Sequence, residues 1–448
     1  MVRIAAFWAK GYRSLRDVRL DDLDRPFNVF YGKNGSGKSN ILAGIQAVFD
    51  LAAHWARYAN TVDDVTGRPE TWTTDERCKL GDTRETQLGV TLVASENEGP
   101  IFSRTSGKAV YRLEFAVFFD WLTGQTSLGP LLRGPFQFDL RDDAKAQATW
   151  PSPDPPPAFD EIRHLLRERL PRHAYTLVTA DRFPHLEEDS LSAAKSVLEL
   201  VHAGKLYEAL YRAQAAPDPA VRMRLKRLRT LLEGKPLERP QFDIVCDPKT
   251  KKIDLREPFR GQPSALGEVS DISVRMAGLG IAQIYSLLAQ LLLPGTRIAG
   301  IEEPEANLHA PDTGRDLRVL LERVVDEGIL DQLFISTHSN LFDLDDTGYH
   351  EVTYDPELGT QVKRSPLHEV DKHFYEPGPA LRALREFASY MGDEDVGLRG
   401  PDGSVITTSE LIDRLRRDDD AAVEFLREMH AAAVRMTMLK GRKKPAGS

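Results

Sequence analysis

Residues 32–39 read GKNGSGKS, and this stretch decides the fold class of the chain. It satisfies the pattern G-x-x-x-x-G-K-[ST] between an apolar, strand-like segment at 27–31 and a helix-like segment at 40–49. The glycines let the backbone curl so that successive N–H groups point inward, and the helix that follows contributes the positive end of its dipole. The order of strand, loop and helix therefore predicts a nucleotide-binding α/β domain with a nest for polyphosphate.

Each residue type in this loop has a role in binding a nucleotide. We expect Lys38 to reach the β- and γ-phosphates of ATP, and the Ser39 hydroxyl to be a ligand of Mg²⁺. The predicted cradle consists of Gly32, Lys33, Asn34, Gly35, Ser36, Gly37, Lys38, Ser39 and Asn40. The alternative is a glycine-rich turn that binds nothing, which the position between a strand and a helix disfavours.

A second apolar segment, 298–301, ends in two carboxylates, Glu302 and Glu303. Phosphoryl transfer requires one acidic group near Mg²⁺ and one that orients the attacking water. We expect Glu302 to take the first role and Glu303 to take the second. A strand that merely ends in a solvated acidic turn is the alternative.

A third apolar segment, 332–335, is followed by Ser336, Thr337 and His338. A lone histidine after a strand is more often structural than catalytic. Ligands, however, collect at the carboxyl ends of parallel strands. We therefore expect His338 to lie at the same edge of the sheet as the P-loop and the two glutamates.

Composition and breaks in the pattern divide the chain into four regions. The first two are an N-terminal ATPase lobe at 1–150, with an antiparallel β layer, and a helical insertion at 151–240 that opens with a proline-rich stretch. They are followed by a C-terminal ATPase lobe at 241–355, with a helix at about 273–292, and by a mainly helical extension at 356–448. The predicted fold is α/β, with a P-loop NTPase core.

Overall composition excludes several classes of protein. The chain has 41% hydrophobic residues and a net charge of −9, which is ordinary for a globular protein and does not indicate nucleic-acid binding by the chain as a whole. Its two cysteines, Cys78 and Cys246, form no disulfide framework or CxxC pair. The most apolar segment, 281–295, is too short to span a bilayer. We expect a cytoplasmic protein with no membrane contact.

Five segments together resemble the ABC-type ATPase heads, and specifically the soluble AAA/ABC-type ATPases of the RecF, SMC and OLD families. They are GYRSLRDVRL at 11–20, GKNGSGKSN at 32–40, GLGIAQ at 278–283, IEEPEANLHA at 301–310 and STHSNLF at 336–342. The resemblance implies an ABC-type P-loop core, with ATP and Mg²⁺ as ligands. It also implies a head-to-tail homodimer, or a higher homo-oligomer, with ATP held between subunits.

The resemblance further implies roles for particular residues. His338 matches the switch histidine, Glu303 keeps the catalytic position, and Glu302 replaces the usual aspartate of the metal site. Gly278 and Gly280 occupy the signature region that contacts the nucleotide held by the other subunit, and that region also contains Ser273 and Arg275. Strand order alone makes Gln87 a candidate for the Q-loop. No Toprim nuclease domain is recognisable in the chain, and the acidic run at 418–420 is typical of a solvated helix face.

A basic helix lies inside the predicted insertion. It gathers Arg222, Arg224, Lys226, Arg227 and Arg229. Such a cluster is typical of a DNA or RNA phosphate track, and it is equally typical of a solvated helix that pairs with an acidic surface. Both interpretations stay open.

The leading hypothesis is an ATPase that dimerises around ATP and couples this to engagement of nucleic acid or a partner protein. By analogy it would be the ATPase subunit of a prokaryotic anti-phage defence system with a separately encoded effector. The alternative is a RecF-like DNA-repair or chromosome-maintenance clamp. A third possibility is a nucleotide-binding scaffold with little turnover.

Overall fold

The computed structural model of the chain forms two compact units, Met1–Arg364 and Ser365–Ser448. The structure describes residues 2–58, 65–66, 74–80, 84–94, 101–103, 109–122, 125–129, 138–139, 147–148, 175–180, 196–202, 205–258, 271–274, 279–306, 308, 311–339, 342, 347–365, 397–399, 403–408, 410–411, 414, 419 and 421–429. The proline-rich start of the predicted insertion and the signature residues Arg275 and Gly278 lie outside these residues.

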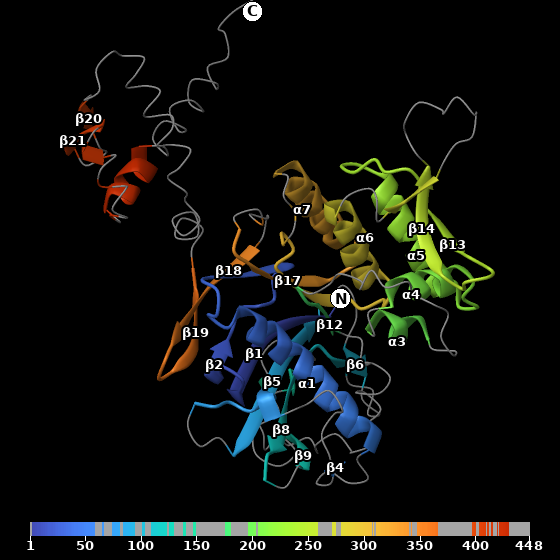
Figure 1. Ribbon diagram of the computed structural model, residues 1–448. Helices are drawn as coiled ribbons and strands as arrows, with labels where there is room; N and C mark the ends of the chain where they lie inside the picture. Colours follow the sequence, from blue (N-terminus) through green and yellow to red (C-terminus); the bar gives the residue numbers. More distant parts are fainter. Residues whose placement is uncertain are drawn as a thin grey trace, which may run out of the picture. The chain divides into compact units, whose positions relative to one another are not determined.

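A six-stranded sheet forms the core of the first unit (Figure 1). In order across the sheet, its strands are β12 (Tyr175–Val178), β16 (Ile298–Glu302), β17 (Gln332–Thr337), β3 (Phe27–Tyr31), β18 (Thr347–Asp355) and β19 (Gly359–Arg364). All neighbours are parallel except β18 and β19. Every residue of β3 and β17 is buried, as expected for parallel strands covered on both faces. The three segments with predicted chemistry therefore end at one edge of the sheet.

Helix α1 (Lys38–Tyr58) lies between this sheet and a second, antiparallel sheet (Figure 1). Its inward residues, Ile41, Leu42, Ile45 and Val48, recur every three or four positions and are fully buried. On the other side of the parallel sheet lie α6 (Leu279–Leu292) and α7 (Pro311–Asp326). The helix that begins at the P-loop thus supplies the middle layer of the unit.

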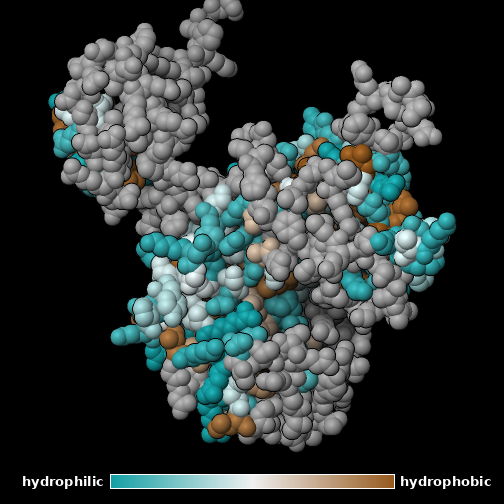
Figure 2. Space-filling view, viewed as in Figure 1, coloured by the Kyte–Doolittle hydropathy of each residue, from teal (hydrophilic) through white to brown (hydrophobic). Residues whose placement is uncertain are grey.

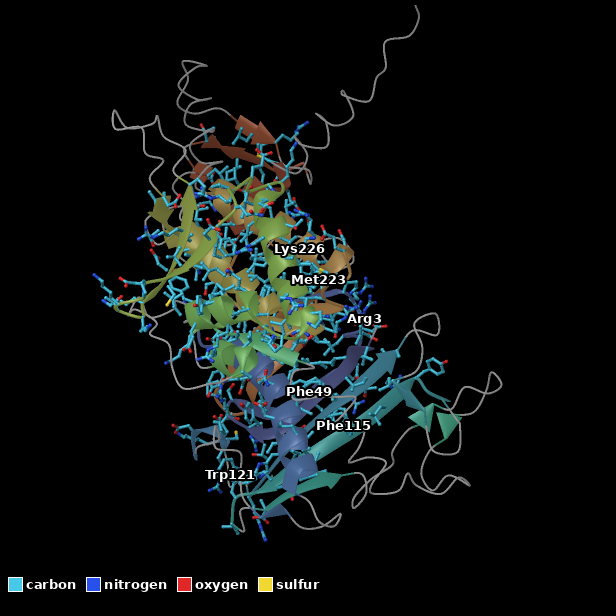
Figure 3. All side chains as sticks on the ribbon, turned by 90° about the vertical axis from the view of Figure 1, so that its right-hand side faces the viewer. Arg3, Phe49, Phe115, Trp121, Met223 and Lys226 are labelled. Atoms are coloured by element: carbon cyan, nitrogen blue, oxygen red, sulfur yellow. The ribbon has the colours of Figure 1, made fainter. Side chains whose placement is uncertain are left out.

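The antiparallel sheet confirms the predicted β layer. Its longest strands are β1 (Val2–Tyr12), β2 (Leu15–Leu20), β5 (Glu85–Ala94) and β8 (Arg112–Asp120); the shorter strands β4 (Val65–Thr66), β9 (Gln125–Gly129), β10 (Phe138–Asp139) and β11 (Gln147–Ala148) belong to the same sheet. Along β8, buried and half-buried residues alternate, so that side chains such as Phe115 face the core (Figure 3). Just beyond β8, the Trp121 indole donates a hydrogen bond to Thr86 Oγ1 at 2.9 Å.

The first unit also contains the 3-10 helix η1 (Thr74–Glu76), the pair of β6 (Phe102–Ser103) and β7 (Ala109–Val110), and a helical cluster with a small sheet. This cluster contains α3 (Val197–His202), α4 (Leu206–Gln214), α5 (Pro219–Glu233), β13 (Asp243–Cys246), β14 (Ile253–Pro258) and β15 (Asp271–Ser273). Asp218 caps α5 by accepting a hydrogen bond from the backbone N–H of Ala220, and Pro219 opens the helix. Buried Glu257 forms an ion pair with Arg239 and accepts a hydrogen bond from Tyr285. Burial, reinforced by Glu257, raises the pKa of Tyr285.

Two expectations about secondary structure need correction. The insertion at 151–240 is not purely helical, because β12 lies within it and belongs to the core sheet. Four residues are too few for periodicity to separate a strand from a helix. The helix expected from about position 273 begins at Leu279, since β15 pairs with β14 through Ser273.

The second unit contains a strand pair that the sequence analysis does not predict within the mainly helical extension. Strands β20 (Gly397–Arg399) and β21 (Val405–Thr407) form an antiparallel pair, followed by a helical segment at 421–429. Leu398 and Ile406 pack with Leu411, Ala422 and Leu426 in a small core of its own. Within the described residues, no helix combines the length and apolar character needed to cross a membrane.

Candidate nucleotide-binding site

The P-loop connects β3 to α1 in a conformation that only glycine can adopt at two positions. Gly32 has φ of +152°, and a Cβ there would lie 2.1 Å from the carbonyl oxygen of Val352. Gly37 has φ of +104°, and its Cβ would lie 2.0 Å from Thr360 Oγ1. Both close approaches come from the β18–β19 hairpin. The glycines of the motif therefore serve packing against this hairpin as well as the curl of the loop.

A chain of hydrogen bonds holds the P-loop to two neighbouring turns. Asn40 Nδ2 donates to Ser14 Oγ at 2.7 Å, Ser14 Oγ lies 2.7 Å from Thr360 Oγ1, and Thr360 Oγ1 donates to the carbonyl oxygen of Ser36 at 3.1 Å. Because each hydroxyl has one proton, Ser14 is the donor in the middle step. The backbone N–H of Thr360 also donates to the Ser14 carbonyl at 2.9 Å. Residues from three distant segments thus fix the shape of the loop.

Lys38 is buried, with 4% of its surface exposed. Its ammonium donates to the carbonyl oxygens of Gly32 at 2.9 Å and Lys33 at 3.1 Å, and lies 3.1 Å from His338 Nε2. Burial lowers the pKa of Lys38, while Glu303 and Glu305 act in the opposite direction. The loop carbonyls hold the ammonium at the centre of the nest, where phosphate oxygens would replace them.

His338 Nε2 lies between a cation and an anion. It is 3.1 Å from Lys38 Nζ and 3.1 Å from Glu303 Oε1. A bare Nε2 can accept from the ammonium, whereas a protonated Nε2 can donate to the carboxylate; one nitrogen cannot do both at once. The position of the imidazole proton therefore decides which of the two contacts is a hydrogen bond.

The two glutamates that end β16 point to different neighbours. Glu302 Oε2 accepts a hydrogen bond from the backbone N–H of Ala180, just beyond β12, at 3.2 Å. Glu303 has φ of +41°, which is uncommon for a residue with a Cβ, and its N–H donates to the carbonyl of Ser336 at 2.8 Å. Such left-handed conformations gather at functional sites. The turn at Glu303 places its carboxylate next to His338, whereas the Glu302 carboxylate contacts Ala180.

Glu305 is a site residue that the sequence analysis missed. Its Oε1 accepts from Thr337 Oγ1 at 2.6 Å and from the backbone N–H of His338 at 2.8 Å. Its Oε2 is buried without a hydrogen-bond partner. Glu305 therefore orients the segment that carries His338. The available signal was a third carboxylate two residues after Glu303, separated from it by Pro304.

The predicted Mg²⁺ ligands have the right chemistry. Ser39 is exposed in the first turn of α1, and Glu302 ends β16; both offer the oxygen atoms that Mg²⁺ prefers. Among the described residues, no three His, Cys, Asp or Glu side chains form a metal cage, and Mg²⁺ in such sites usually takes few protein ligands together with phosphate oxygens and water. When bound, the ion would neutralise charge on the β- and γ-phosphates.

Other predicted residues lie apart from the loop. Gly280 lies in the first turn of α6, and Ser273 ends β15 with its hydroxyl donating to Asp254 Oδ1 at 2.7 Å. Gln87 lies on β5 of the antiparallel sheet, where its amide donates to Glu85 Oε1 at 2.9 Å. The signature and Q-loop assignments stay predictions.

Part of the sequence matches a known protein family. A family model described as an AAA domain matches residues 9–108, which contain the end of β1, all of β2 and β3, the P-loop, α1 and β5. The chain resembles an AAA/ABC-type ATPase head. No curated protein matches this sequence.

Solved structures similar to this chain include heads of SMC proteins. The SMC head domain from Thermotoga maritima gives a TM-score of 0.39 at 13% identity, over 81% of this chain and 99% of that one. An SMC head bound to the C-winged helix domain of ScpA gives a TM-score of 0.45 at 12% identity, over 83% of this chain and 99% of that one. An SMC head with an extended coiled coil is bound to the C-terminal domain of ScpA derived from Pyrococcus furiosus. It gives a TM-score of 0.45 at 12% identity, over 83% of this chain and 98% of that one.

Proposed function

We propose that the chain is an ATPase that binds ATP with Mg²⁺ at the P-loop and hydrolyses it with Glu303 as the group that orients the attacking water. The observation that carries this proposal is the convergence of Lys38, His338 and Glu303, with His338 Nε2 at 3.1 Å from each of the other two. A solvated acidic turn would not need to meet a P-loop lysine. A catalytic site requires these side chains to lie close together, because the phosphate and the attacking water must be held next to each other.

The chain's own groups account for the main requirements of hydrolysis. The Lys38 ammonium would exchange the carbonyls of Gly32 and Lys33 for phosphate oxygens, which are stronger, charged acceptors. Once His338 is released from Lys38, the tautomer with its proton on Nε2 can donate to Glu303. A carboxylate oriented in this way can accept a proton from water as a general base.

A second copy of the chain would complete the site. Lys33, Asn34, Gly35 and Ser39 are exposed, so one side of the nucleotide nest is open to a covering surface. In a head-to-tail dimer that surface would include Gly280, at the start of α6, from the other subunit. ATP binding would then close the dimer and hydrolysis would open it.

We further propose that ATP binding and hydrolysis are coupled to engagement of nucleic acid or a partner protein. We favour a cytosolic ATPase subunit of an anti-phage defence system that acts with a separately encoded effector, by analogy with stand-alone ATPases of this type. The alternative is a RecF-like clamp. Hydrolysis that rises with DNA alone would favour the clamp, whereas hydrolysis that requires a partner protein would favour the defence subunit.

The decisive experiment compares Glu303→Gln with Glu357→Gln, an exposed glutamate in the β18–β19 turn. We expect Glu303→Gln to lower the hydrolysis rate by roughly 100-fold or more while ATP affinity is kept, because only water activation is lost. Light scattering with Mg-ATP should show this variant trapped as a dimer. Equal hydrolysis by the two variants would disprove the role of Glu303; an unchanged mass would disprove the ATP-dependent dimer.

A further inference from the structure

Helix α5 lines a pocket that lies outside the nucleotide-binding site. The pocket has a volume of about 400 Å³ and is formed by residues of α5, the end of α4 and Gln241, which precedes β13. We call it the α5 pocket. Its charged lining residues are Arg222, Lys226, Arg229 and Glu233. Figure 3 labels Lys226 and Met223 on α5, Phe115 on β8 and Trp121 just beyond that strand.

The basic residues of α5 do not form one continuous track. Arg224 NH1 donates to the carbonyl oxygens of Leu293 at 3.0 Å and Pro294 at 3.2 Å, so this cation serves the C-terminal end of α6. Arg222, Lys226 and Arg229 are spaced by four and three positions, which places them on one face of the helix. That face lines the pocket, and Arg227 is not part of its lining.

Two of the pocket's cations retain capacity to bind an anion. Within the described part of the chain, the Lys226 ammonium has no hydrogen bond or ion pair, and the side chain is exposed. The Arg229 guanidinium lies over the Phe242 ring at 5.3 Å and reaches Gln214 Oε1 at 3.4 Å, yet its Nε is buried with no hydrogen-bond partner. A buried guanidinium N–H without an acceptor is costly, and a ligand oxygen would satisfy it.

The balance of charge indicates what kind of anion fits. Arg222, Lys226 and Arg229 carry three positive charges against the single carboxylate of Glu233. Arg222 is held in place by the carbonyl oxygens of Ala216 and Pro217. A phosphomonoester carries about −1.5 to −2 at neutral pH and would neutralise this excess, whereas a phosphodiester or a single carboxylate carries −1. Pockets of this size accommodate small ligands such as mononucleotides.

We propose that the α5 pocket binds a terminal phosphomonoester of a nucleotide. The ligand is either a free mononucleotide or the 5′-phosphorylated end of a nucleic-acid strand, since both present the same dianion. Arg229 and Lys226 contact the phosphate, and the amides of Gln214 and Gln241 lie where they can bind the sugar or base. This inference does not depend on ATP hydrolysis at the P-loop.

The test uses the full chain with Lys38→Ala, which removes phosphate binding at the P-loop. Fluorescence anisotropy measures binding of a labelled ten-nucleotide oligothymidylate with a 5′-phosphate or a 5′-hydroxyl, and competition measures binding of AMP. We expect the 5′-phosphate to increase affinity at least about tenfold. Competition by AMP identifies the mononucleotide as a ligand, and failure of AMP with retained preference for the 5′-phosphate identifies the strand end.

Matched variants then locate the site. Lys226→Gln with Arg229→Gln should lower affinity for the 5′-phosphorylated probe at least about tenfold, and Arg227→Gln, on the same helix but outside the pocket, should change it less than about twofold. Lys226→Glu alone provides a second variant at an exposed position in case the double variant does not fold. Equal losses at Lys226 and Arg227, equal affinity for the two probes, equally strong competition by an oligoglutamate peptide, or no binding up to millimolar concentration would each overturn the proposal.

Discussion

The P-loop and the α5 pocket both gather positive charge, but they hold it differently. Lys38 is 4% exposed, and its ammonium contacts two carbonyl oxygens and His338. Lys226 is exposed and, among the described residues, contacts no acidic group. A buried ammonium must be compensated by fixed partners, whereas an exposed one is compensated by water and salt. We therefore expect the first site to accept one ligand geometry and the second to select its ligand mainly by charge.

The surface of the first unit is mainly hydrophilic among the residues that Figure 2 colours. Hydrophilic residues cover much of the visible face of the first unit in Figure 2, and hydrophobic residues occur there only in small groups. The exposed large hydrophobic side chains among the described residues are Leu122, Met223, Val245, Tyr354, Leu358 and Val405. They belong to several different elements. Polar and charged groups therefore offer the specific contacts of both regions.

The largest effect should come from Lys38→Ala. Loss of about two charge-assisted hydrogen bonds to phosphate should lower ATP affinity on the order of 1,000-fold, about 4 kcal/mol. Titration with a fluorescent ATP analogue measures this change, with Lys249→Ala, an exposed lysine in the β13–β14 turn, as the control. Tight ATP binding by Lys38→Ala would show that the buried ammonium is structural and would remove the contrast between the two regions.

Acid pH should weaken the sheet that carries the P-loop. His350 on β18 is 2% exposed and packs on Phe30 of β3 at 5.0 Å; burial, with Arg364, lowers its pKa from 6.5 to about 4. Below pH 6.5 the unfolded chain takes up a proton that the folded chain does not. The resulting contribution, about 3 kcal/mol, is present above pH 6.5 and is lost as the pH falls toward 4.

Urea unfolding at pH 7 and pH 5 tests this linkage in the wild type and in His350→Leu. The variant has no titrating ring, so its loss of stability between the two pH values should be smaller than that of the wild type. A pH dependence that is the same in both proteins would show that His350 does not contribute.

A smaller effect is expected from Thr360→Val, which keeps the volume of the side chain but removes its hydroxyl. The Ser36 carbonyl and Ser14 would each lose a hydrogen bond, at about 1–2 kcal/mol in stability. The loosened P-loop should also bind ATP several-fold more weakly. Thermal unfolding and ATP titration check both results, with Thr353→Val on β18 as the control. Unchanged ATP affinity in Thr360→Val would show that the loop keeps its shape without the hairpin.

The smallest effect concerns salt. Raising ionic strength from about 50 to 200 mM should weaken binding of the phosphorylated oligonucleotide at the α5 pocket a few-fold, because Arg222 and Lys226 are exposed and exchange counterions. Binding of ATP at buried Lys38 should change less over the same range. Parallel titrations of the two ligands measure the ratio. A stronger salt dependence at the P-loop would reverse the comparison.

Much of the fold could be predicted because the deciding signals are local. The apolar segments that became β3, β16 and β17, and the helix after the P-loop, are each identified by their own periodicity and end residues. The edge strand β12 could not be identified in this way. Its four residues acquire their strand conformation from pairing with β16, a segment more than a hundred positions later.

The candidate site shows the same division. Glu303 and His338 could be proposed from the strand ends that precede them, whereas the supporting roles of Glu305 and Thr360 could not. Glu305 acts through Thr337 and the His338 backbone, and Thr360 acts through the carbonyl of Ser36. Neither residue type has a spacing that marks such a role, because hydrogen bonds to a distant backbone depend on three-dimensional position alone.

By itself, the sequence determined a P-loop, an α/β core and the residue types able to perform phosphoryl transfer, because these depend on short segments with their own steric and hydrogen-bonding requirements. Only the tertiary structure decided that His338 meets both Lys38 and Glu303, and that the basic residues of α5 divide between the end of α6 and a pocket. Parallel strand pairing sets the first arrangement and helix packing sets the second. Both join residues whose separation along the chain says nothing about their separation in space.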